Sequence, residues 1–132
     1  MKYIKATIKA ITTEGKAKTY HFLISAVSCV DAEMTAGKIL EERQGEMQLQ
    51  EFRVSEVKEQ PRIASVQFDC SSTEEGGKFW KVDAKIETLE SHSVSESVVV
   101  QCRFALDAIN QSGYTLEDVV GVSIFNIEDV IV

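Results

Sequence analysis

The sequence repeats itself at a fixed offset, and an internal repeat limits the folds that a chain can adopt. Lys2-Tyr3-Ile4-Lys5 recurs as Lys78-Phe79-Trp80-Lys81, which is a shift of 76 positions from residue 2 to residue 78. The same shift, without a gap, aligns two further pairs of segments: 22–24 with 98–100, and 30–32 with 106–108. Three separate matches at one offset predict an internal duplication.

The chain of 132 residues fits one domain of ordinary size. We therefore expect a single domain over 1–132, with a first repeat at about 1–69 and a second at about 78–132. The polar, glycine-containing segment 70–77 would link them.

Each repeat contains the same predicted elements in the same order. Residues 2–12 and 78–89 alternate between apolar and polar side chains, as half-buried strands do. The following elements are a second strand, a helix beginning near Ser28 or Leu106, and closing strands at 50–58, 62–68, 119–127 and 129–132. The sequence thus predicts an α+β fold: two tandem ββαβ repeats in a mainly antiparallel sheet, with two helices on one face and a pseudo-two-fold relation.

The two predicted helices differ in their end signals. Ser28 is a good N-cap for the first helix, Asp31 suits its first turn, and Gly45 follows its last turn. Phe104 occupies the position that matches Ser28 in the second repeat, so the second helix is specified less well.

Composition favours a globular protein that folds without metal or disulfides. Apolar residues make up 44% of the chain, and the net charge is −7. The longest apolar run is about four residues, far short of the ~20 of a membrane helix, and the N-terminus has no signal-peptide core. The three cysteines, Cys29, Cys70 and Cys102, have no metal-site or disulfide spacing. We expect a cytoplasmic protein without a membrane partner.

The Phe79-Trp80-Lys81-Val82 strand start, the apolar second strand and the Asp-Ala helix start resemble an uncharacterised family of domains of unknown function. Its members are small proteins from gut bacteria of the Bacteroides type and from their phages and mobile elements. The resemblance implies a setting in a phage or conjugative element. It implies no activity and supplies no catalytic residues.

We expect no catalytic, cofactor-binding or metal site, and therefore no enzyme. His21 and Cys29 lie at opposite ends of a strand and a turn, too far apart for a nucleophile–base pair. Asp31 and Asp107 recur in both repeats, but an aspartate in a first helical turn stabilises exposed backbone N–H groups.

The outward face of the two first strands carries the best functional signal. Because side chains alternate between the two faces along a strand, the odd-numbered positions place an aromatic residue and two lysines there in each repeat: Tyr3, Lys5 and Lys9, then Phe79, Lys81 and Lys85. Aromatic rings that alternate with lysines on a sheet are typical of single-stranded nucleic-acid binding, although lysines also protect exposed strands from aggregation.

Two functions follow as hypotheses. The first is a protein-interaction or assembly module without catalysis, associated with a phage or mobile element, that binds an unknown protein or a second copy of itself through strand edges. The alternative is a single-stranded nucleic-acid-binding protein that uses the aromatic and lysine side chains on the outward faces of the two first strands. We call each of these sets a stripe: Tyr3, Lys5 and Lys9 in the first repeat, and Phe79, Lys81 and Lys85 in the second. Exposed rings at Tyr3 and Phe79 would favour the alternative, and covered ones would favour the first.

Overall fold

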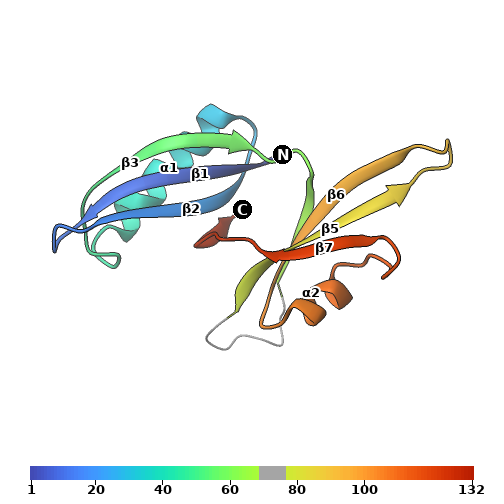
Figure 1. Ribbon diagram of the computed structural model, residues 1–132. Helices are drawn as coiled ribbons and strands as arrows, with labels where there is room; N and C mark the ends of the chain where they lie inside the picture. The colour runs from blue at the N-terminus through green and yellow to red at the C-terminus, as the bar shows by residue number, and fades with distance from the viewer. Residues whose placement is uncertain (69–76) are drawn as a thin grey trace. The chain divides into compact units, whose positions relative to one another are not determined.

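The computed structural model describes residues 1–68 and 77–132 of the chain. The predicted α+β class is confirmed (Figure 1). The elements in chain order are β1 (Lys2–Thr12), β2 (Ala17–Ala26), α1 (Cys29–Arg43), β3 (Leu49–Glu59), β4 (Ile63–Phe68), β5 (Lys78–Glu87), β6 (Ser93–Cys102), α2 (Ala105–Gln111), β7 (Val119–Ile124) and β8 (Asp129–Ile131).

The described strands form two mixed sheets, so the prediction of a single sheet is wrong. One sheet has the order β3-β1-β2-β8 and the other has the order β4-β6-β5-β7. The chain divides into two compact units: unit 1 comprises 1–61 and 127–132, and unit 2 comprises 62–126. Each sheet carries its own helix, α1 in unit 1 and α2 in unit 2.

The unit boundaries differ from the predicted repeat boundaries because the last strand of each half is exchanged. β4 follows β3 in the chain but pairs in parallel with β6 of unit 2, whereas β8 pairs in parallel with β2 of unit 1. Parallel pairing needs a crossover connection, and this arrangement supplies one for each added strand. Most of the predicted linker, 70–76, lies outside the described residues.

The strand registers of the two units correspond. Ile4 lies opposite Ile24 in unit 1, and Trp80 lies opposite Val100 in unit 2, each 76 positions further on. Duplication stays a hypothesis, and these registers support it.

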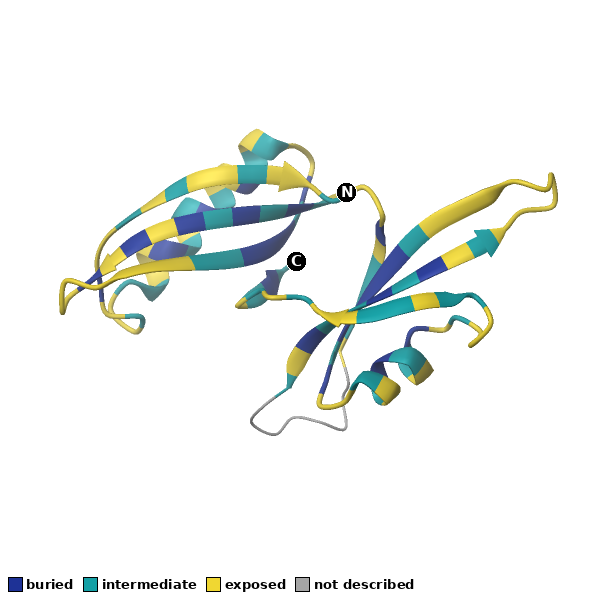
Figure 2. Ribbon diagram, viewed as in Figure 1, coloured by how far each residue is buried: buried dark blue, intermediate teal, exposed yellow. Residues whose placement is uncertain are grey.

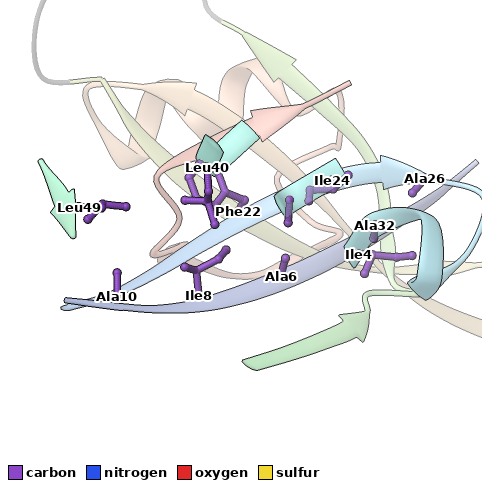
Figure 3. Packing of buried hydrophobic residues seen from close by; sticks show 11 residues of the cluster. Ile4, Ala6, Ile8, Ala10, Phe22, Ile24, Ala26, Ala32, Leu40 and Leu49 are labelled. Atoms are coloured by element: carbon purple, nitrogen blue, oxygen red, sulfur yellow. The ribbon is translucent and has the colours of Figure 1, made fainter. Parts of the chain in front are cut away.

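The core of unit 1 forms between one face of its sheet and α1. The even-numbered residues of β1 point to this face, as their alternation predicts, and Leu40 and Phe22 fill the space below the helix (Figure 3). The buried cluster comprises Ile4, Ala6, Ile8, Ala10, Phe22, Ile24, Ala26, Ala32, Ala36, Leu40 and Leu49. Long aliphatic and aromatic side chains in this layer contribute roughly 1.5–3 kcal/mol each through burial.

The core of unit 2 below α2 is smaller and is built on alternate residues of β6. Val98, Val100 and Val82 pack below α2, whose buried contribution is Ala108. Trp80 is half-buried at its margin and donates its indole Nε1–H to the carbonyl of Cys102 at 3.1 Å.

The helix ends follow the sequence signals in part. Ser28 caps α1, because its Oγ accepts from the amide of Asp31 at 3.2 Å, and Phe104 makes no side-chain cap on α2. The left-handed backbone after α1 occurs at Gln48 (φ 56°) and not at the predicted stop, Gly45. No helix in the described part of the chain is long and apolar enough to cross a bilayer.

Candidate functional site

The predicted stripe of unit 1 lies on the sheet face away from α1, as parity requires. Lys9 is exposed there, and Tyr3 and Lys5 are half-buried. The strand therefore presents one accessible cation and two partly accessible side chains to solvent.

The matching stripe of unit 2 is different. Phe79 points away from α2 but is only 6% exposed, so of the two outcomes considered for this ring, exposed or covered, the structure has the covered one. Lys81 has its Nζ 3.9 Å from Oδ1 of Asp83, while Lys85 is exposed. A buried ring cannot stack on a base, so the two stripes are not two copies of one surface.

Strand register adds two cations to the face of unit 1 that sequence reasoning missed. Lys9 lies opposite Arg53 of β3, and Lys5 lies opposite Lys58. We call these four residues the cationic face. Like charges directly opposite each other destabilise a sheet, and Glu56, which lies between the two pairs along β3, offsets part of this repulsion.

An open hollow lies at the hairpin end of the cationic face. Its volume is about 530 Å³, and Lys9, Lys18, Thr19 and Arg53 are among its lining residues. Glu51 lines the same hollow, so three cations and one carboxylate surround it and its formal charge is positive. A positive lining favours an anionic ligand over a cationic one.

His21 lies on the same face, next to β1. Its Nδ1 is 3.1 Å from Oγ1 of Thr7. Burial lowers the pKa of His21 below its ordinary value, and the charge of Lys5 lowers it further, against the opposing influence of Glu128 and Glu56. The surroundings of His21 therefore disfavour its charged form, mainly because the ring is partly removed from water.

The edge strands next to β1 and β5, one in each sheet, differ sharply in chemistry. β3 is the edge of unit 1 next to β1, and it carries charges of both signs along its length: Glu51, Arg53, Glu56, Lys58 and Glu59. β7 is the corresponding edge of unit 2 next to β5, and its sequence, Val-Val-Gly-Val-Ser-Ile, carries no charge. Charges on an edge prevent association with other strands, so the β3 edge is protected and β7 is not.

β7 offers backbone groups as well as apolar side chains. The amide of Phe125 donates to the carbonyl of Phe79 at 2.7 Å. Because amides alternate in direction along an antiparallel strand, those of Val122 and Ile124 point away from β5. Among the described strands, β7 pairs with β5 alone.

Figure 2 shows that β7 has no buried residue, in contrast to the neighbouring β5 and β6. Val120 is 67% exposed and Ile124 is 53% exposed. Val120 is the extra residue of a bulge, because the register shifts by one between Asp83 and Ala84. We call the outward side of this strand, Val119–Ile124, the β7 edge.

The residues considered for chemistry have structural roles or stand apart. Asp31 accepts the amide of Val27 at 3.1 Å and so belongs to the cap of α1. Cys29 is half-buried, Cys102 is buried with its Sγ 3.3 Å from the carbonyl oxygen of Phe104, and Cys70 lies outside the described residues. Within 1–68 and 77–132, no three His, Cys, Asp or Glu side chains form a group able to hold a metal ion.

Comparison with known proteins gave no match, whether with protein-family models, curated proteins or solved structures. The resemblance to the Bacteroides-type family therefore stays a prediction.

Proposed function

We propose that the protein is a protein-interaction or assembly module without catalytic activity, and that it binds its partner by adding a strand to the β7 edge. One observation carries this proposal: β7 is an edge strand without charge, and its outward amides and exposed apolar side chains face solvent. The family resemblance adds the proposal that the module works in the setting of a phage or mobile element, and the sequence pattern adds the proposal that it is cytoplasmic.

Strand addition suits the chemistry of this edge. A partner strand would satisfy the outward amides of Val122 and Ile124 and the adjoining carbonyl groups, and each such bond contributes about 0.5–1.5 kcal/mol net. It would also cover part of Val120 and Ile124, whose apolar side chains are exposed.

Site-specific photocrosslinking tests the proposal. A photoreactive phenylalanine derivative replaces Val120 in the protein expressed in cells, and the same residue replaces Met34 on α1 as an equally exposed control. We expect a discrete crosslinked product from position 120 and none from position 34. If irradiation gives no product from 120 above that from 34, the β7 edge is not an interaction site.

The cationic face supports a second candidate, single-stranded nucleic-acid binding. The observation in its favour is that two pairs of cations occupy directly opposite strand positions, Lys9 with Arg53 and Lys5 with Lys58, because a bound phosphate backbone would relieve the repulsion between like charges. The half-buried ring of Tyr3 belongs to the same face, whereas Phe79 is buried. This candidate therefore concerns unit 1 only.

Fluorescence anisotropy with labelled single-stranded DNA and RNA tests this candidate. We expect salt-sensitive binding that weakens in a Lys9→Gln, Arg53→Gln variant. A Lys85→Gln, Lys16→Gln variant removes the same charge from exposed positions elsewhere and serves as the control. Absence of binding at low salt, or equal loss in both variants, would eliminate the cationic face as a nucleic-acid site.

A further inference from the structure

We infer that the β7 edge binds a second copy of the same chain, with the two β7 strands antiparallel and paired around Val122. This inference rests on the proposed function and names its partner. It follows from the distribution of charges around β7 and from the direction of its amides.

The charges decide between the two possible directions. A parallel pair in register would place Glu117 and Asp118 of one copy beside the same residues of the other, and like charges opposite each other are unfavourable. An antiparallel pair separates them, because Glu117 and Asp118 at the N-terminal end of β7 then lie beside the C-terminal end of β7 in the other copy. Antiparallel pairing of identical strands also gives a closed two-fold dimer.

The amide directions select the register. In an antiparallel pair, residues that face each other across the bonded positions must both direct their amides outward. Val122 meets this condition, so it can lie opposite its own copy, with Ile124 opposite Val120 and Asp118 opposite Asn126. Val122 can exchange backbone hydrogen bonds with its own copy in such a pair, and no acidic residue lies directly opposite another.

The resulting sheet would run β4-β6-β5-β7 through one copy and return in reverse order through the other. The two-fold axis would pass through the sheet at Val122, which places both α2 helices on the same face. Trp80, the only tryptophan, lies opposite Ile124 on the neighbouring strand and thus one strand from the new contact.

A neutral strand is the best match for an edge without charge, and the chain itself carries one. A charged partner strand would leave its charges against Val120 and Ile124 without a counter-charge on the β7 edge. Two of the other edges are less suitable for the same pairing, because β3 carries five charges and β8 has only three residues. β4, at the opposite edge of the unit 2 sheet, is uncharged over its six residues as well, but it pairs in parallel with its neighbour and carries a register shift near its start.

Sedimentation equilibrium of the purified full chain, from low micromolar to several hundred micromolar, tests the inference. We expect a reversible monomer–dimer equilibrium with an affinity typical of a small interface. Val120→Lys places a charge on the edge, and Ile124→Pro removes an outward amide while leaving the bond from Phe125 to Phe79 in place. Each should raise the dimer dissociation constant at least tenfold.

Leu116→Lys is the matched control. Leu116 is 74% exposed and precedes β7, so this variant adds the same charge outside the strand and should dimerise like the native chain. Thermal unfolding of all three variants shows whether each is folded, and Val120→Lys decides the test if Ile124→Pro unfolds.

Two results would overturn the inference: a native chain that stays monomeric throughout, or a dimer that persists in both Val120→Lys and Ile124→Pro. A monomeric native chain is compatible with a crosslink from position 120 to another protein. In that case the β7 edge is an interaction site for a different partner, and only the self-pairing is wrong. Absence of both dimer and crosslink would remove the proposed function as well.

Discussion

β3 and β7 occupy the same place in their sheets, each as the outer neighbour of the first strand of its half, yet they have opposite edge chemistry. β3 has 11 residues and carries both acidic and basic side chains, whereas β7 has six residues and no charge. Both contain a register shift, so the bulge does not explain the difference. Two halves with the same order of elements can therefore have different edges: the charges of β3 oppose association with another strand, whereas the uncharged β7 lacks this protection.

The helices of the two units also differ from each other. α1 has 15 residues, a side-chain cap and three buried residues, whereas α2 has seven residues, no side-chain cap and one buried residue. The difference in helix packing therefore predicts that unit 1 depends on its helix for stability more than unit 2 does.

Removal of a large side chain below α1 should give the largest effect. Leu40 is fully buried between α1 and the sheet, so Leu40→Ala should lower the free energy of unfolding by roughly 2–5 kcal/mol. Met34→Ala on the exposed side of the same helix is the control and should change it by less than about 0.5 kcal/mol. Denaturant titration measures both, and equal effects would show that α1 does not complete the core of unit 1.

Exchange of the cap residues should give an intermediate effect and sharpen the comparison of the helices. Ser28→Ala should destabilise α1 by about 1 kcal/mol, because the amide of Asp31 loses its partner. Phe104→Ser should stabilise α2 by about 0.5–1 kcal/mol, because Phe104 is 64% exposed and makes no cap. Thermal unfolding measures both, and a loss of stability in Phe104→Ser would show that its ring has a packing role.

The smallest expected effect concerns the cationic face. The pKa of His21 lies below its ordinary value through burial first and Lys5 second, so Lys5→Gln should raise it and Glu56→Gln should lower it. Since the folded state holds the proton less tightly than the unfolded state, His21 costs stability as pH falls below about 6.5. Titration of the imidazole by NMR measures the pKa, and no change in Lys5→Gln would show that the potential of this face does not reach His21.

The sequence predicted local structure well because its signals are local. Alternation in 2–12 identified the inward residues of β1, and Ser28 identified the cap of α1. The short segments 62–68 and 129–132 were also predicted as strands and are confirmed as β4 and β8.

The exchange of those strands was not predicted, because it depends on which sheet offers a partner and not on the strand itself. β8 is only three residues long, and its sequence contains no signal that identifies β2 as its pairing partner.

The candidate surfaces needed the strand register. Arg53 and Lys58 are about fifty residues from Lys9 and Lys5 in the chain, so only their pairing reveals the cationic face. Parity placed Phe79 correctly on the outer side of β5, but it could not show that this position is buried. The absence of charge in 119–124 was visible in the sequence, and its meaning became clear once β7 proved to be an edge.

Amide hydrogen exchange at single-residue resolution, measured over a range of protein concentrations, tests the difference between the two edges most directly. The outward amides of Val122 and Ile124 should become more protected as concentration rises, while the outward amide of Val57 on β3 should exchange at a constant rate. That result would confirm that β7 is the associating edge. Protection that is independent of concentration at Val122 and Ile124, or that rises equally at Val57, would contradict it.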